Sequence, residues 1–365
     1  MTDDVTSQWQ QEMDRNVHRM KNFATLLMDR SEPPVGCTPR EEIYKKHKSR
    51  LFLYRGTGTY RTPVLFVPNL GISRPYIFDL QPKSSFIEYM TQQGFDVYLL
   101  DWGVFGPEDD HLTVEDCVVR ILPRMVRKVL EHSRERSLTM IGYCMGAPIS
   151  ACFIATHAEI PVANFINMAG PIDFEQGGIF RCWLDPKYFN ADRFVDVMGQ
   201  VPAELIKAGF KMLKPTMDLS TGLNLWWNLW NDEYVTGYKA LSKWANEYVG
   251  FPTGFFRQWV KDFYQQNRMI RGGLVFGGRT VSLGNIRCPL LVVGAKEDYI
   301  TPPASAKALI EAVGSTDKTY LELPGGHISL IAGRGAAAHC WPKVGAWLDV
   351  RSDRADDRRA SHGRH

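Results

Sequence analysis

The sequence has little excess charge of either sign and no paired cysteine motif. Its 43 lysine and arginine residues nearly balance 40 aspartate and glutamate residues, which leaves a formal net charge of +3 and argues against a nucleic-acid partner. The seven cysteines are scattered, without a Cys-x-x-Cys pair or a Cys/His cluster of metal-ligand spacing, and we find no signal peptide. We therefore expect free thiols, a reducing cytoplasm and no metal site.

Long uninterrupted hydrophobic runs are also missing. The stretch 137–158 carries no charge, but Gly142, Gly146 and Pro148 interrupt it, so we expect a buried strand and helix and no transmembrane segment. Internal repeats are absent as well. A chain of 365 residues suits one large α/β domain with an insertion, or two domains.

The most informative stretch is this charge-free one. The apolar run Leu138–Ile141 predicts a buried strand, and Gly142-Tyr143-Cys144-Met145-Gly146 follows it before a helix. Strand, sharp turn and helix with flanking glycines make up a nucleophile elbow, in which Cys144 is the nucleophile and the Met145 amide faces a developing oxyanion. On this pattern alone, Cys144 could equally be a small core residue.

Strands and helices alternate on both sides of the elbow, which predicts an α/β-hydrolase fold with a mainly parallel sheet and a helical cap insertion. The expected strands are 51–54, 64–67, 97–101, 138–141, 162–168, 289–294 and 320–323, and the expected long helices are 113–133 and 335–348. The expected organisation is an N-terminal amphipathic helix and linker (1–40), a core (41–173 and 275–350), a cap (174–274) and a disordered tail (351–365).

Two segments have an unusual apolar pattern. The first helix has apolar side chains on one face, which indicates packing or, as the alternative, a docking surface for another subunit; these are Trp9, Met13, Val17, Met20, Phe23, Leu26 and Leu27. The cap is rich in aromatic residues, which we expect in its core, with some facing a channel or a greasy surface; they include Trp183, Trp226, Trp227, Trp230, Trp244, Phe255, Phe256, Trp259, Phe263 and Tyr264.

Two further residues complete a possible triad. Asp298 and His327 each follow an expected strand, and the order Cys144, Asp298, His327 is that of α/β-hydrolases. Each could alone be an ordinary loop residue, but together they predict a nucleophile, a supporting acid and a base. The loop 68–73 follows the strand 64–67, and Leu70 is our choice there for the second oxyanion amide.

A cysteine nucleophile favours acyl transfer. When a thiol attacks a thioester, the bound acyl group stays activated, and His327 can then activate an incoming hydroxyl. A cysteine-dependent hydrolase, either a thioesterase or an esterase, remains the alternative. A second alternative is a subunit of the same fold whose site has lost activity and which works by binding.

Several further motifs are distinctive when taken together. They are Arg74-Pro-Tyr-Ile-Phe-Asp-Leu-Gln-Pro82, Val97-Tyr-Leu-Leu-Asp-Trp-Gly103, the elbow at 142–146, Phe263-Tyr-Gln-Gln-Asn-Arg268, Gly277-Gly-Arg279, Asp298 with Pro302-Pro303, and Gly325-Gly-His327. With these motifs the chain resembles the polyhydroxyalkanoate synthases, specifically the shorter catalytic subunits of the two-component classes, from about residue 45 to 348.

This resemblance implies polymerisation of (R)-3-hydroxyacyl-CoA, such as 3-hydroxybutyryl-CoA, into polyester with release of CoA. It implies that Cys144 holds the growing chain as a thioester, with His327 as base and Asp298 in support, and that no cofactor is needed. It also implies a homodimer, a second synthase subunit of the PhaE or PhaR type, and attachment to cytoplasmic polymer granules. Two departures are Ala147, where a second glycine is usual, and Tyr299, where histidine is usual.

Overall fold

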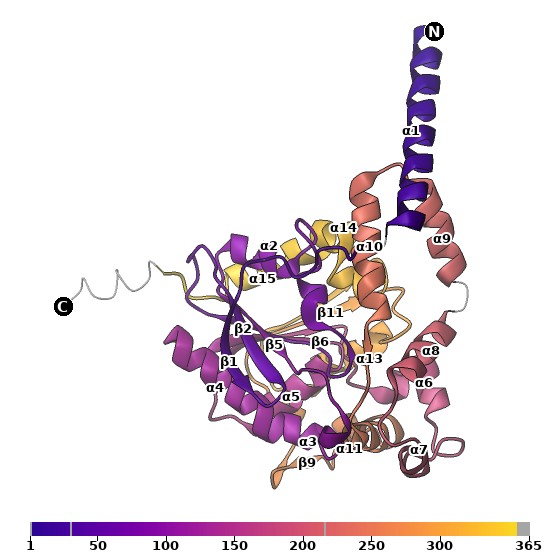
Figure 1. The fold of residues 1–365 in the computed structure, drawn as a ribbon. Coiled ribbons are helices and arrows are strands. Elements are labelled where there is room, and N and C mark those ends of the chain that lie inside the picture. Colours follow the sequence, from indigo (N-terminus) through magenta and orange to yellow (C-terminus); the bar gives the residue numbers. More distant parts are fainter. Residues whose placement is uncertain (1, 30, 215–216, 356–365) are drawn as a thin grey trace, which may run out of the picture.

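The computed structural model describes residues 2–29, 31–214 and 217–355, and its centre is an eight-stranded sheet (Figure 1). The strand order is β1-β2-β5-β3-β6-β7-β11-β12; β2 pairs antiparallel with both β1 and β5, and all the other pairs are parallel. These strands are β1 (Glu41–Lys46), β2 (Ser49–Tyr54), β3 (Val64–Val67), β5 (Val97–Asp101), β6 (Leu138–Tyr143), β7 (Val162–Met168), β11 (Leu290–Ala295) and β12 (Lys318–Leu323). The predicted mainly parallel sheet is confirmed. Strand β1 is not among the expected strands, because this edge strand is rich in charge and lacks an apolar face.

Helices cover both faces of the sheet. In Figure 1, α2 and α15 lie above the sheet, and α4 and α5 lie below it. The helices are α1 (Thr2–Met28), α2 (Phe86–Gln93), α3 (Val114–Asp116), α4 (Leu122–Ser133), α5 (Gly146–Thr156), α6 (Gly178–Trp183), α7 (Ala191–Met198), α8 (Ala203–Leu213), α9 (Met217–Asn228), α10 (Asp232–Asn246), α11 (Thr253–Gln258), α12 (Arg268–Arg271), α13 (Pro303–Ala312), α14 (Gly333–Gly335) and α15 (Trp341–Asp349). Every residue of β3 and β6 is buried, because both strands are apolar on both faces.

Two of the predicted long helices are interrupted. The expected helix 113–133 consists of α3, a π-helical turn at Cys117–Ile121, and α4, which has Pro123 near its start. Proline lacks an N–H and its ring crowds the carbonyl four residues earlier, so a wider turn accommodates it. The expected helix 335–348 has the same feature, since a π-helical turn at Ala336–Cys340 precedes Pro342 in α15.

Residues 174–274 contain α6 to α12, which lie together on one side of the sheet in Figure 1. Aromatic rings form the interior of this region: Trp259 stacks on Phe255 at 5.9 Å and on Phe263 at 4.6 Å. Both ends of this segment are joined by Asn267, whose side chain donates to Asp173 Oδ1 (2.7 Å) and accepts from the Phe174 amide (3.0 Å). One side chain thus fixes where the chain leaves and re-enters the core.

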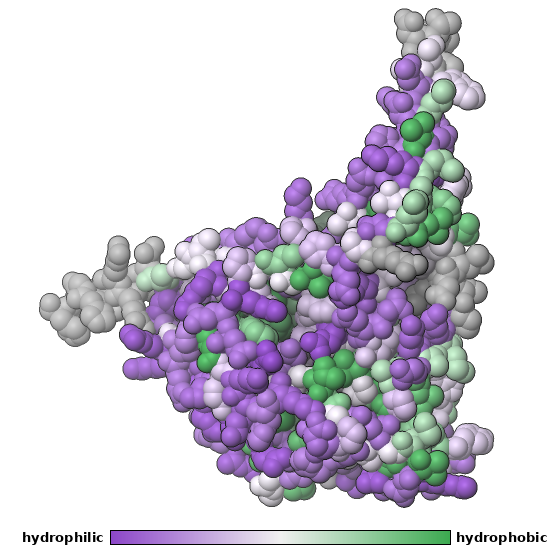
Figure 2. Space-filling model, viewed as in Figure 1, coloured by the Kyte–Doolittle hydropathy of each residue, from purple (hydrophilic) through white to green (hydrophobic). Residues whose placement is uncertain are grey.

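Most of the apolar face of the first helix is not packed, although Phe23 near its C-terminal end contacts the cap at Trp226. The helix projects from the body (Figure 1), and Figure 2 shows hydrophobic side chains along it. Trp9, Met13 and Val17 are 65–70% exposed, because the helix contacts the cap through its other face, where Asn22 donates to the Leu229 carbonyl oxygen (2.8 Å). The packing interpretation is therefore wrong for most of this face. No helix in the described part of the chain is long and apolar enough to cross a membrane.

The expected disordered tail, 351–365, does not begin at residue 351. Arg351 makes a bidentate ion pair with Asp317 (2.8 and 2.9 Å), and the Ala355 amide donates to the Thr59 carbonyl oxygen (3.0 Å). A polar segment can thus be anchored by charge and backbone hydrogen bonds without apolar residues. Residues 356–365 lie outside the described part of the chain.

Candidate active site

The site is built on a tight turn between β6 and α5. Cys144 occupies this turn with a φ of 52°, in the left-handed region, and its amide donates to the Met168 carbonyl oxygen on the neighbouring strand β7 (3.0 Å). A non-glycine residue in this region is strained, and such strain is typical of a nucleophile elbow. The predicted strand, turn and helix are present in that order. All seven cysteines are free, as expected.

Two glycines let the surrounding backbones approach this turn. A Cβ on Gly142 would lie 2.5 Å from Ala147 Cα, and a Cβ on Gly146 would lie 2.0 Å from the Val67 carbonyl oxygen and 2.5 Å from that of Pro68. Any side chain at these positions would force the backbone apart. The glycines therefore bring the start of α5 against the end of β3 and the loop that follows it.

Asp298 and His327 meet beside the elbow. They lie just after β11 and β12, and His327 Nδ1–H donates to Asp298 Oδ2 over 2.7 Å. The other carboxylate oxygen, Oδ1, accepts from the Ile300 amide (2.9 Å) and the Thr301 amide (2.8 Å). The Asp298 side chain is fully buried and that of His327 is 6% exposed. The carboxylate is thus held by two backbone donors and fixes the imidazole tautomer.

The imidazole also interacts with Cys144. Burial by itself lowers the pKa of His327, but the charges of Asp298 and Cys144 and hydrogen bonds with both side chains outweigh it and raise this pKa to about 10. An imidazole that is stabilised in its charged form can accept a proton from a neighbouring thiol. The structure therefore brings the three predicted triad residues together.

Backbone amides without acceptors lie next to the elbow. In the described part of the chain, the N–H groups of Met145 and Leu70 donate no hydrogen bond to another residue, and the same holds for Asn69 and Gly71. Met145 is 4% exposed and Leu70 is fully buried. Buried amides without an acceptor are rare in proteins, so these groups are candidates for binding an oxyanion.

The two departures from the family pattern are placed differently. The methyl group of Ala147 faces Gly170, where an added Cβ would lie only 2.2 Å from it. Tyr299 follows Asp298, but its side chain points outward: it is 54% exposed and Lys214 of the cap lies 5.2 Å above its ring. Alanine at 147 is therefore accommodated by a glycine opposite it, and Tyr299 contributes a contact between core and cap.

Two tyrosines lie close to the triad and were not predicted there. Tyr143 donates to the His327 carbonyl oxygen (3.4 Å), and the two rings are 5.0 Å apart. Burial and then the charge of Cys144 raise the pKa of Tyr264, whose ring packs edge-on against Phe174 at 4.9 Å. Both residues belong to motifs noted above, the elbow and the stretch 263–268, but sequence spacing does not reveal that a cap residue reaches the elbow.

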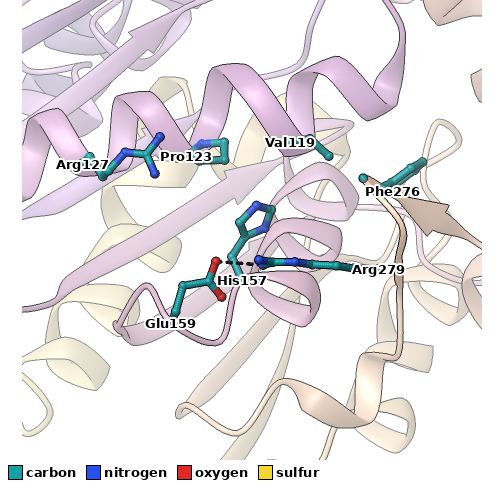
Figure 3. Close-up of a pocket in the computed structure, with 8 residues that line it drawn as sticks. Val119, Pro123, Arg127, His157, Glu159, Phe276 and Arg279 are labelled. Atoms are coloured by element: carbon teal, nitrogen blue, oxygen red, sulfur yellow. Dashed lines mark hydrogen bonds and ion pairs between the residues drawn. The ribbon is translucent and has the colours of Figure 1, made fainter.

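The hollow shown in Figure 3 is separate from the triad. Its walls come from α4, the end of α5 and the hairpin of β9 (Val275–Phe276) and β10 (Arg279–Thr280). Arg279 donates to the Thr156 carbonyl oxygen (2.7 Å) and to Glu159 (2.8 Å), which fastens the hairpin to the end of α5. His157 lies here, at the end of α5 that is farther from Cys144. The described residues hold no His/Cys/Asp/Glu cluster that could bind a metal ion.

Comparison with known proteins agrees with this geometry at the level of the fold. The model of a family described as alpha/beta hydrolase fold matches residues 62–333. A monoacylglycerol lipase from Paleococcus ferrophilus superposes with a TM-score of 0.53 and 17% identity, over 83% of this chain and 99% of that one. A soluble variant of monoglyceride lipase from Saccharomyces cerevisiae gives a TM-score of 0.54 and 15% identity, over 87% of this chain and 98% of that one. The protein is thus an α/β-hydrolase by fold.

Sequence relatives define a narrower group. The poly(3-hydroxyalkanoate) polymerase subunit PhaC of Haloferax mediterranei is 34% identical over 90% of this chain and 67% of its own length. The protein of the same name from Thiocystis violacea is 32% identical over 89% of this chain and 92% of its own length. The one from Synechocystis is 30% identical over 93% of this chain and 94% of its own length. The chain belongs to the poly(3-hydroxyalkanoate) polymerase subunit PhaC family.

The raised pKa of His327 predicts a pH-dependent stability. A group whose pKa rises on folding, here from an ordinary 6.5 to about 10, stabilises the fold fully below pH 6.5, and this contribution is lost as the pH rises through about 10. In Asp298→Asn the pKa of His327 should be raised less, so the free energy of unfolding should vary less between pH 6.5 and about 10. Denaturant titrations of both proteins between pH 6 and 10 measure this. Asp317→Asn is the control, because it removes a carboxylate that pairs with Arg351 and not with His327. Curves for Asp298→Asn parallel to the parent would contradict the prediction.

The contact between Ala147 and Gly170 predicts a coupled pair. Gly170→Ala should lower the free energy of unfolding by about 1–3 kcal/mol through overpacking. The double variant Ala147→Gly with Gly170→Ala should regain part of this stability, because the 2.2 Å contact between the two methyl groups is gone. It should not regain all of it, because Asn167 Oδ1 still lies 2.6 Å from the new methyl group. Denaturant unfolding of all four proteins gives the coupling energy. Gly209→Ala, on α8 with no atom near, is the control without overpacking and should not lower the free energy of unfolding; strictly additive effects of the first two changes would be the contrary result.

Proposed function

We propose that the protein is an acyltransferase that polymerises (R)-3-hydroxyacyl-CoA, most simply 3-hydroxybutyryl-CoA, into polyhydroxyalkanoate with release of CoA. One observation carries this proposal: Cys144, in a strained elbow, interacts with an imidazole that is hydrogen-bonded to a buried carboxylate. Membership of the PhaC family supports the polymerase activity, since the relatives are named for it.

In the first step, His327 accepts the proton of Cys144 and the thiolate sulfur attacks the acyl carbonyl carbon of the CoA thioester. The carbonyl oxygen becomes an oxyanion, which the amides of Met145 and Leu70 would stabilise. The carbonyl re-forms as the bond to the CoA sulfur breaks, and His327 returns the proton to the leaving CoA thiol. The product is an acyl group on Cys144, at the energy of the thioester it replaced.

In the second step, the acceptor is the 3-hydroxyl group of another hydroxyacyl unit. His327 accepts the hydroxyl proton, the oxygen attacks the Cys144 thioester, and the thiolate of Cys144 leaves as an ester bond forms. Asp298 keeps the imidazole oriented in both steps. The same amides would serve both oxyanions.

Burial of the site favours transfer over hydrolysis. Cys144 is 8% exposed, and the side chains of His327 and Asp298 are 6% and 0% exposed. Excluding water protects an acyl-enzyme that must wait for a hydroxyl acceptor. A cysteine hydrolase of the same fold is the alternative, and the structural likeness to lipases bears on the fold alone.

Cys144→Ala tests this function. We expect CoA release from 3-hydroxybutyryl-CoA to fall by more than about 10³-fold, because no other group can form the thioester. Cys152→Ala is the matched control, since Cys152 is a buried cysteine on the helix after the elbow and should retain turnover. Absorbance assays of free thiol follow CoA release in both. Full turnover by Cys144→Ala would remove this residue from the mechanism.

Products separate the polymerase from its alternatives in the same assay. Insoluble polyester formed alongside CoA supports the polymerase, whereas one free hydroxy acid for each CoA supports a hydrolase. Purified protein that binds granules but releases no CoA, with a second subunit present, would support a binding subunit.

The proposal includes a second synthase subunit that docks on α1. Exposed apolar side chains recur on α1 at spacings of three and four residues, which is typical of a helix–helix seam; they are Trp9, Met13, Val17, Met20, Phe23 and Leu27. The helix is fixed at its base, where Phe23 packs edge-on against Trp226 at 5.9 Å, so the stripe is presented outward. A homodimer and attachment to polymer granules in the cytoplasm complete the proposal.

Charges in this stripe should disrupt docking. Met13→Glu combined with Met20→Glu should weaken binding of a purified second subunit by about tenfold or more, because burying a carboxylate replaces burial of a methionine. The matched control, Gln11→Glu with His18→Glu, adds the same charge on the polar face of α1. Size-exclusion chromatography of the mixed subunits measures binding, and thermal unfolding checks that both variants fold. Equal binding by the two would refute docking on α1.

A further inference from the structure

The loop that follows β3 in the chain and packs against the cap has an unusual backbone. In this loop, Asn69–Ser73, both Gly71 (φ 64°) and Ile72 (φ 61°) adopt the left-handed conformation. For a β-branched residue such as Ile72 this conformation is strongly disfavoured, and it persists only where the surroundings impose it. The same loop follows the carbonyl groups that contact Gly146, so it borders the elbow.

Asn69 holds the loop from inside. Its side-chain amide donates to the Gly71 carbonyl oxygen (2.7 Å) and to Ser73 Oγ (3.2 Å), and the residue is only 6% exposed. The Ser73 amide donates to the same Gly71 carbonyl oxygen (2.7 Å). Two donors thus converge on one carbonyl group and fix the direction of the peptide that follows it.

The cap holds the loop from outside. A two-residue strand, β4 (Ile72–Ser73), pairs antiparallel with β8 (Tyr248–Val249) of the cap. The ring of Phe251 closes the gap at Gly71, where an added Cβ would lie 2.9 Å from Phe251 Cδ1.

Two hydrogen bonds continue this attachment beyond the loop. Trp244 Nε1 donates to the Arg74 carbonyl oxygen (2.8 Å), and the Tyr76 hydroxyl donates to Glu247 Oε2 (2.8 Å). The cap segment 244–251 is therefore joined to the core along the whole length of the loop.

We propose that Asn69 and Phe251 are positioning residues that hold the amide of Leu70 where the oxyanion forms, so that the cap supplies the support for one half of the oxyanion site. Leu70 is fully buried and its amide, like those of Asn69 and Gly71, has no acceptor in the described part of the chain. It lies directly between Asn69, which holds the loop from inside, and Gly71, against which Phe251 packs. The inference rests on the proposed acyl transfer at Cys144. It implies that acyl transfer proceeds only while the cap segment is paired with the loop.

Asn69→Ala and Phe251→Ala test this inference in the full-length protein. We expect kcat for CoA release from 3-hydroxybutyryl-CoA to fall about 10- to 100-fold in each, as when one oxyanion donor is misplaced, with KM nearly unchanged. Alkylation of Cys144 by iodoacetamide, followed by mass spectrometry of the peptide that contains it, should stay close to the parent rate. Displacement of iodide at carbon forms no oxyanion, so this reaction reports on the triad alone.

Asn164→Ala is the matched control. Asn164 is 1% exposed and also donates two hydrogen bonds, to Thr139 Oγ1 (3.0 Å) and to the Arg351 carbonyl oxygen (3.1 Å), but it lies on β7 away from the loop. It should lose stability in thermal unfolding and keep kcat. Parental kcat in Asn69→Ala, or an equal fall in alkylation, would overturn the inference, and Phe251→Ala decides if Asn69→Ala does not fold. Failure of the proposed function itself would appear separately, as full turnover in Cys144→Ala.

Discussion

The close approach of three backbones at the elbow is the constraint on which the rest of the site depends. Cys144 takes a left-handed conformation because β6 ends where α5 must begin, and Gly146 lets the helix start directly against the Val67 and Pro68 carbonyl groups. This contact sets the Met145 amide beside the loop that carries Leu70. A side chain at Gly142 or Gly146 would move Cys144 away from the amides of Met145 and Leu70, which the proposed mechanism needs beside it.

The triad is organised from the acid outward. Two backbone amides hold Asp298, which holds the imidazole of His327, which in turn interacts with Cys144. Each group sits at the carboxyl end of a different strand, so the parallel sheet sets their spacing. Asp298 and His327 are buried, and a buried charge without a partner would be costly. Under the proposed mechanism this favours a concerted proton transfer between the Cys144 thiol and the His327 imidazole.

The cap does more than cover the sheet. Asn267 joins its two ends, β8 pairs with the loop after β3, and Tyr264 reaches the vicinity of Cys144. Its aromatic residues divide accordingly, since Phe255, Trp259 and Phe263 form an interior stack whereas Trp227 is 65% exposed. A segment that lies near Cys144 and pairs with the loop of Leu70 would, under the proposed mechanism, link substrate entry to chemistry.

The sequence by itself determined the parallel sheet, the elbow and the order of Cys144, Asp298 and His327, because apolar runs and glycine spacing are local signals. Tertiary structure decided what these signals cannot carry. A π-helical turn before a proline interrupts each of two expected helices. The exposed face of α1 could not be told from a packing face, because amphipathicity identifies an apolar face but not its partner. The same holds for the loop of Asn69 and for Tyr264, whose contacts with the cap and with the core come from residues distant in the sequence and exist only once the cap has folded onto the sheet.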